Sequence, residues 1–170
     1  MIHIPSYNDY LNEQDLLLET GEIVTPYKWK FVDIKRGSYN YKFTGMDNLG
    51  YECWFQPEGA PSSNAYEIKF TTEGATNGDK ADLTNKGDAI KVVSTVIDIL
   101  KDFMVRVKYL NFLIAIGSPT EEEKAKGINP TKRSKLYYIM LEKNKKEIFG
   151  KKMPKDIEFN RRASEIFITF

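Results

Sequence analysis

The chain has 170 residues, 41% of them hydrophobic and 29% charged, an ordinary composition for one soluble globular domain. The longest apolar run, Tyr109 to Ile116, is too short to span a bilayer, and residues 1–5 lack the basic and apolar regions of a signal peptide. A single cysteine, Cys53, excludes an internal disulfide. We therefore expect a cytoplasmic protein with no membrane segment.

The net charge of +1 is unevenly distributed along the chain. Residues 1–86 carry 8 basic and 13 acidic side chains, whereas residues 87–170 carry 17 and 11. The segment 124–152 alone holds 10 basic residues against two acidic ones. Such a segment attracts anionic partners, although a solvated helix face rich in lysine has the same composition.

The first predicted element is an arm within residues 1–24. Ser6 suits an N-cap, and Asp9 is its acidic partner, which favours a helix that ends near Gly21. An irregular arm fits the same residues.

Four segments in which aromatic and polar residues alternate predict an antiparallel meander with one buried face. The strands are expected at Tyr27–Phe31, Tyr39–Phe43, Tyr51–Phe55 and Tyr66–Phe70. The segment from Thr71 to Lys86 is rich in Gly, Asn and Asp, and predicts a long loop.

The chain changes character near residue 86, where the first long helix is predicted at about 88–104. Asp88 suits its N-cap, and the apolar residues between Ala89 and Phe103 form a face broad enough to lie across a sheet. Asp98 and Asp102 fall opposite that face and are expected to be solvated.

The second half of the chain completes the predicted domain. Tyr109–Ile116 is apolar on both faces, which predicts a central, fully buried strand. A loop at 117–131 leads to a second helix at about 132–149. Strands are expected near Ile157–Phe159 and Ile166–Phe170. We therefore predict one α+β domain over residues 1–170, a mainly antiparallel sheet of five to seven strands covered by two main helices.

The sequence predicts no catalytic, cofactor-binding or metal-binding residue. One histidine and one cysteine are too few for a common zinc site, and Ser-His-Asp or Cys-His chemistry would have to use His3, close to the terminus. Cys53 is expected to be a small core residue. Gly87 precedes a helix start that could hold an anion, but Asp88 is expected to compete for the same N–H groups.

Four residues are the candidate contacts for an anion or another partner. They are Lys132, Arg133, Lys135 and Tyr138. Basic side chains in the first turn of a helix oppose its dipole, which favours a partner for them. That partner is either a ligand or the acidic group Glu121 to Glu123.

Two groups of residues carry a family resemblance. Gly87-Asp88-Ala89 with Val93 and Thr95-Val96, followed by Arg133-Ser134-Lys135-Leu136-Tyr137, resembles a pattern in small uncharacterised proteins of tailed bacteriophages. The resemblance spans about residues 66–148, with Arg133 and Ser134 in swapped order and a longer loop between the groups. It implies a viral origin, in the host cytoplasm or the virion, and no known activity.

Three functions compete at this stage. The favoured one is a non-enzymatic structural or interaction protein, such as a bacteriophage accessory or virion component, that binds protein partners or itself. The second is a GNAT-like acyltransferase, whose cofactor lies against backbone groups and whose strand, helix, strand, helix order fits; its glycine-rich pyrophosphate loop is reduced to Asn85-Lys86-Gly87. The third is a nucleic-acid-binding protein that uses residues 124–152.

Overall fold

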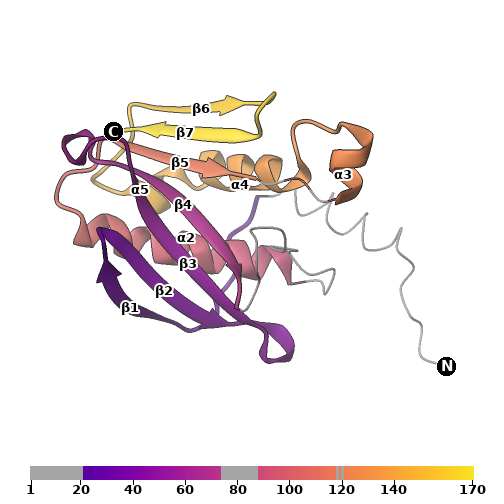
Figure 1. The fold of residues 1–170 in the computed structure, drawn as a ribbon, viewed down its shortest axis with the longest axis horizontal. Coiled ribbons are helices and arrows are strands. Elements are labelled where there is room, and N and C mark those ends of the chain that lie inside the picture. Colours follow the sequence, from indigo (N-terminus) through magenta and orange to yellow (C-terminus); the bar gives the residue numbers. More distant parts are fainter. Residues whose placement is uncertain (1–20, 74–87, 118, 120) are drawn as a thin grey trace.

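Seven strands form one sheet in the order β1-β2-β3-β4-β5-β7-β6 (Figure 1). The computed structural model describes residues 21–73, 88–117, 119 and 121–170, so most of the predicted arm and long loop lie outside the described residues. The strands are β1 (Trp29–Lys35), β2 (Ser38–Thr44), β3 (Gly50–Glu58), β4 (Ala65–Thr72), β5 (Phe112–Ile116), β6 (Asp156–Asn160) and β7 (Glu165–Thr169). Short 3-10 helices, η1 (Met46–Asn48) and η2 (Pro61–Ser63), lie in the connections of the meander.

The first four strands form the antiparallel meander that the alternating residues predict. Cys53 pairs with Tyr41 on one side and with Phe70 on the other, so these side chains share one face of the sheet. The next residue along each strand faces the opposite side. The face that carries Cys53 is the buried one, since Cys53 and Tyr41 are each 1% exposed.

One pair of described strands, β4 and β5, is parallel, and α2 (Ala89–Arg106) is the crossover between them. Their ladder runs from Ala65 opposite Phe112 to Ile68 opposite Ala115. β4 continues to Thr72 and stays paired with β3 to that residue. Beyond Ile68 the two parallel strands therefore part, and from Lys69 to Thr71 the side of β4 toward β5 has no strand partner among the described residues.

The helices α2, α4 and α5 lie on the Cys53 face of the sheet. The helices after β5 are α3 (Glu121–Lys126), α4 (Lys132–Lys143) and α5 (Lys145–Phe149). Phe103 of α2 stacks on Phe55 of β3 at 3.9 Å between ring centroids, and Phe149 of α5 contacts Phe170. In Figure 1 the strands cross in front of α2.

The predicted helix at 88–104 is confirmed, whereas the one at 132–149 is divided in two. The break lies at Asn144, which has non-helical backbone angles. Its side-chain amide donates to the carbonyl oxygens of Met140 and Gly21. Asn144 thereby ends α4 and ties it to the segment that enters β1.

α2 is buried almost all around, and its polar residues are hydrogen-bonded to other segments. Every residue from Val92 to Ile97 is buried. The hydroxyl groups of Ser94 and Thr95 accept the backbone N–H groups of Val24 and Tyr27 at 3.1 and 2.9 Å. The segment before β1 therefore covers the part of α2 that the sheet does not.

Asp98 and Asp102 are half-buried and hydrogen-bonded rather than freely solvated, so this prediction is wrong. The indole Nε1 of Trp29 donates to Asp98 at 2.7 Å, and the hydroxyl of Tyr41 donates to Asp102 at 2.9 Å. Helical periodicity places both carboxylates opposite the apolar stripe, but β1 and β2 reach them with long aromatic side chains. These bonds fix the rotation of α2 on the sheet.

We predict that Tyr41→Phe lowers the free energy of unfolding by about 1–2 kcal/mol, because it removes a buried hydrogen bond to a carboxylate. Chemical denaturation of both proteins measures the difference. Tyr109→Phe is the control, since Tyr109 is 64% exposed. Equal stability of Tyr41→Phe and the wild type would show that this bond does not hold α2.

Candidate functional site

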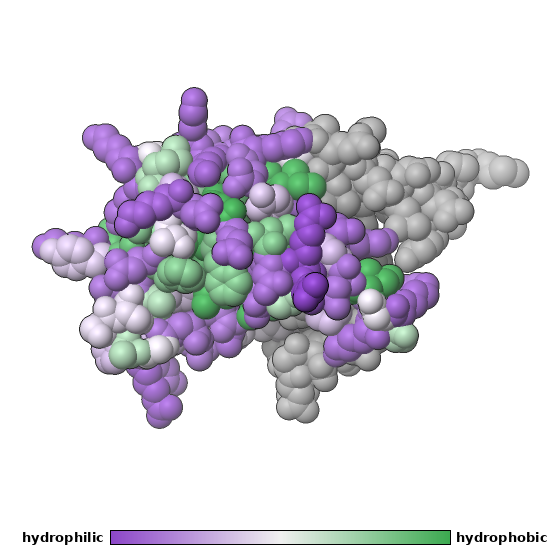
Figure 2. Space-filling model, turned by 90° about the horizontal axis from the view of Figure 1, so that it is seen from above, coloured by the Kyte–Doolittle hydropathy of each residue, from purple (hydrophilic) through white to green (hydrophobic). Residues whose placement is uncertain are grey.

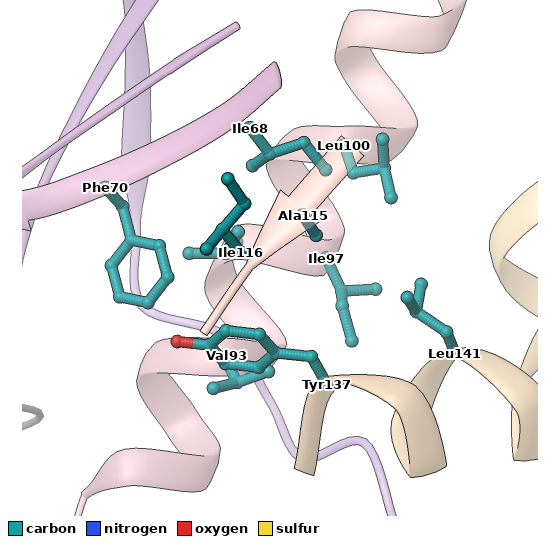
Figure 3. A pocket seen from close by; sticks show the side chains of 10 residues that line it. Ile68, Phe70, Val93, Ile97, Leu100, Ala115, Ile116, Tyr137 and Leu141 are labelled. Atoms are coloured by element: carbon teal, nitrogen blue, oxygen red, sulfur yellow. The ribbon is translucent and has the colours of Figure 1, made fainter. Parts of the chain in front are cut away.

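An apolar cavity of about 50 Å³ lies where β4 and β5 part (Figure 3). β4 and β5 form one wall of the cavity. The other walls are formed by α2, from Val93 to Leu100, and by α4. The lining residues are Ile68, Phe70, Val93, Val96, Ile97, Leu100, Ala115, Ile116, Tyr137 and Leu141. The cavity is thus at the carboxyl ends of the two parallel strands, the position at which ligands bind in open sheets with crossover helices.

Tyr137 has the one polar side chain among the described lining residues. Its ring lies 6.0 Å from that of Phe70, and its hydroxyl is turned toward the side of the cavity on which Phe70 lies (Figure 3). Burial raises the pKa of Tyr137, so the phenol keeps its proton at neutral pH and its O–H can donate a hydrogen bond. The sequence alone does not single out Tyr137, because no local pattern reveals a cavity between strands paired across a crossover.

The start of α2 adjoins this cavity, since Val93 in its lining follows Ala89, the first residue of α2, by one turn. Asp88 was expected to compete there for the helix N–H groups, and this expectation is wrong. Its Oδ2 accepts the hydroxyl of Tyr27 at 2.9 Å and the backbone N–H of Met46 at 3.4 Å, and its side chain makes no capping bond. The N–H groups of the first turn remain uncapped by Asp88, at the positive end of the helix dipole.

The start of α4 is closed by the chain itself. The Thr131 hydroxyl accepts the Ser134 N–H at 3.2 Å, and a carboxylate oxygen of Glu123 accepts the Lys132 N–H at 2.9 Å. An acidic residue from the group at 121–123, rather than a ligand, therefore satisfies this helix end. Buried Glu123 also offsets the basic residues of the first turn.

The four predicted contact residues differ in exposure and in packing. Lys132 and Lys135 are exposed, and Arg133 is half-buried. Tyr138 stacks on Phe159 of β6 at 4.9 Å between ring centroids and helps to hold α4 on the sheet. Their role in binding stays a prediction.

The basic segment at 124–152 is divided among α3, α4, α5 and the turn that follows. Part of its charge is engaged within the chain, as in the pair of Lys126 with Glu122. The ammonium group of Lys152 donates to the carbonyl oxygens of Met104 and Val107 at the end of α2. These contacts weaken the case for a nucleic-acid surface on this segment.

Cys53 lies in the core, as predicted. It is 1% exposed, and burial raises the pKa of its thiol, which makes a nucleophilic thiolate unavailable at neutral pH. The described residues contain no group of three or more His, Cys, Asp or Glu that could hold a metal ion. His3 lies outside them.

The second notable surface is the face of the sheet away from the helices. Burial of β5 on both faces was predicted and is wrong for this side. Leu113 and Ala115 are buried against the helices, but Phe112 and Ile114 are only half-buried and Ile116 is 39% exposed. Apolar residues on an uncovered strand face are typical of an interaction surface.

Phe167 of β7 and Trp54 of β3 extend this apolar surface. Phe167 pairs with Ile114 across the ladder, and its ring lies 6.1 Å from that of Phe112. Both Phe167 and Trp54 are half-buried. Figure 2, which views the molecule from the side of β6 and β7, shows hydrophobic residues gathered among hydrophilic ones.

No known protein family, curated protein or solved structure matches the chain. The resemblance to bacteriophage proteins therefore stays a prediction. Within the described residues, no helix is long and apolar enough to cross a membrane.

We predict that Ala115→Val raises the free energy of unfolding by about 0.5–1 kcal/mol, because its two added methyl groups fill part of the cavity. Ala65→Val on the uncovered face of β4 controls for the higher strand propensity of valine. Denaturation curves of the three proteins decide the point. A loss of stability specific to Ala115→Val would mean that the space is not available to a side chain.

Proposed function

We propose that this chain binds a coenzyme A thioester and transfers its acyl group to an amine, as a GNAT-like acyltransferase does. The observation that carries the proposal is the gap between the parallel strands β4 and β5, with an apolar cavity and a protonated tyrosine in it. The order β4, α2, β5, α3, α4 also contains the strand, helix, strand, helix order that this hypothesis requires, with the short helix α3 inserted before α4. The sequence alone favours the interaction role, whereas the geometry of the gap leads us to put acyl transfer first.

The gap suits the shape of the proposed donor. The pantetheine arm of coenzyme A is thin and carries two amide groups, which need backbone partners. Backbone groups from Lys69 to Thr71 of β4 are paired with β3 on one side, and on the side toward β5 they border the gap without a strand partner in the described chain. The narrow cavity beyond them, about 50 Å³, favours the thin end of such an arm over a bulky ring.

The start of α2 suits the anionic end of the same donor. A diphosphate binds readily to uncapped N–H groups at a helix N-terminus. The sequence objection was the short glycine motif at residues 85–87, which lies outside the described residues. Asp88 does not occupy these N–H groups, because one oxygen of its carboxylate is bonded to Tyr27 and Met46.

The chemistry needs a proton donor more than a nucleophilic side chain. The amine nitrogen attacks the thioester carbonyl carbon, a C–N bond forms, the C–S bond breaks, and the proton lost by the amine leaves to solvent. The departing thiolate must gain a proton. Tyr137, which lines the cavity, is the lining side chain with an O–H to give, and its phenolate then regains a proton from solvent; such a contribution is typically worth about 10²–10⁴ in rate.

We expect acetyl-coenzyme A to raise the melting temperature by several degrees, because ligand at about 100 times its Kd stabilises by about 2.7 kcal/mol. Ala115→Val, which fills the cavity, is expected to lose most of this shift, whereas Ala65→Val keeps it. Differential scanning fluorimetry measures all three. The absence of a wild-type shift at millimolar ligand, or an equal shift in Ala115→Val, contradicts the assigned site.

We further expect Tyr137→Phe to bind acetyl-coenzyme A normally and to release free thiol at least about 10²-fold more slowly in the presence of an amine panel. A thiol-reactive dye follows the reaction. The panel contains a polyamine, free lysine and a peptide with a free amino terminus. Tyr138→Phe is the control, because Tyr138 stacks on Phe159 outside the cavity. Unchanged turnover in Tyr137→Phe would show that Tyr137 takes no part in the reaction.

A second candidate function, assembly through protein contacts as in a bacteriophage accessory or virion component, is favoured by a separate observation. The uncovered sheet face carries Phe112, Ile114, Ile116 and Phe167, apolar residues that a purely solvated face does not need. This role is compatible with acyl transfer, because Phe112, Ile114 and Phe167 are not among the residues that line the cavity, and Ile116 is the residue that both regions share.

A further inference from the structure

The uncovered face of the sheet is basic along one side. Lys30 and Lys35 are exposed on the edge strand β1, and Arg36 follows in the turn to β2. Asp33 is the acidic residue that β1 contributes to this side, and its carboxylate accepts the side-chain amide of Asn40. The β1 side therefore carries an excess of positive charge.

The same face is acidic along the opposite side. Asp156 and Glu158 are exposed on the other edge strand, β6, and Glu165 lies next to them on β7. Arg161 in the turn between β6 and β7 lies over the ring of Phe159, which faces the helices. The apolar residues of β5 and β7 lie between this acidic side and the middle of the sheet.

The two halves of the uncovered face also differ in shape. A hollow of about 780 Å³ extends over β1, β2 and β3, and its lining includes Trp54, Lys35 and Arg36. The apolar surface on β5 and β7 lies on the other half of the sheet. One half of the face is therefore recessed with a basic border on β1, whereas the other half is apolar with an acidic border on β6.

We propose that the occupant of this face is a second copy of the chain, related by a two-fold axis parallel to β4. β4 is the fourth of seven strands, so this axis lays β1 and β2 of one copy over β6 and β7 of the other. The basic side then meets the acidic side twice, and the apolar half of each copy meets the hollow half of its partner. An axis across the strands would instead oppose like charges, so the charge pattern selects the orientation.

The centre of this interface is already neutralised within each copy. Glu67 and Lys69 project from β4 to the uncovered face and form an ion pair at 3.2 Å. When a second sheet covers Glu67 and Lys69, each charged group keeps the other as its partner. Aligned packing of two sheets at about 30° accommodates the twist of both.

The size of the face sets the strength of the dimer. Strands about 4.8 Å apart and about five residues long, at about 3.3 Å per residue, give about 500 Å² per copy for a sheet of this width. The total of about 1,000 Å² is near the lower limit for a specific interface. The dimer is therefore expected to dissociate in the micromolar range. The proposal deepens the assembly function and does not depend on acyl transfer.

Two charge-reversed variants test the dimer by sedimentation equilibrium between about 5 and 500 μM. Lys30→Glu with Lys35→Glu makes both sides of the face acidic, and Asp156→Lys with Glu158→Lys makes both sides basic. Each is expected to stay monomeric at concentrations where the wild type dimerises, whereas an equimolar mixture is expected to form a one-to-one dimer. Lys146→Glu with Lys151→Glu, on exposed residues of α5 and the turn after it, controls for net charge and is expected to dimerise like the wild type.

Circular dichroism confirms that each variant is folded, and the acetyl-coenzyme A melting shift is recorded for all of them. A wild type that stays monomeric at the highest concentration overturns the dimer, as does a mixture that fails to associate or a single variant that dimerises normally. A retained ligand shift in those proteins leaves the acyltransferase proposal intact. If a protein still dimerises but shows no acetyl-coenzyme A melting shift, the dimer stands and the acyltransferase proposal is contradicted.

Discussion

The burial of α2 on nearly every side is the constraint on which the rest of the structure depends. As the crossover between two parallel neighbours, α2 must lie across the sheet, and its apolar stripe meets β3 through Phe103 and Phe55. Its remaining sides carry hydroxyl and carboxylate groups that cannot be buried without partners. The segment before β1 and the aromatic side chains of β1 and β2 supply those partners, and so the meander wraps the helix that it precedes in the chain.

The same arrangement creates the candidate site. A parallel pair needs a crossover, and here its ladder ends after Ile68 and Ala115 while β4 continues beside β3. The space between the parting strands is closed by α2 and by Tyr137 of α4, which leaves an apolar cavity with one phenol hydroxyl. Topology therefore brings together a gap, a helix start and a phenol that are far apart in the sequence, and this combination is the basis of the proposed acyl transfer.

Local patterns were sufficient for the elements and insufficient for the site. Alternating aromatic residues predict the meander, and the run from Ala89 to Phe103 predicts α2, because both depend on neighbours in the chain. The solvation of Asp98, the capping role of Asp88 and the burial of both faces of β5 were predicted wrongly. Each depends on a segment distant in sequence: Trp29 reaches Asp98, Tyr27 engages Asp88, and the described chain has no helix to cover Ile114. The cavity depends on the parallel pairing of β4 and β5, which no local signal encodes.

The most direct measurement of the central claim is a titration of protein labelled at its alanine and isoleucine methyl groups with coenzyme A, followed by two-dimensional NMR. If the gap between β4 and β5 is the binding site, the methyl signals of Ala115, Ile68 and Ile97 shift with one common saturation curve. The methyl signals of Ile157, buried on β6 away from the gap, stay in place. Saturable shifts elsewhere with these three signals unmoved, or no shifts at all, would contradict the account.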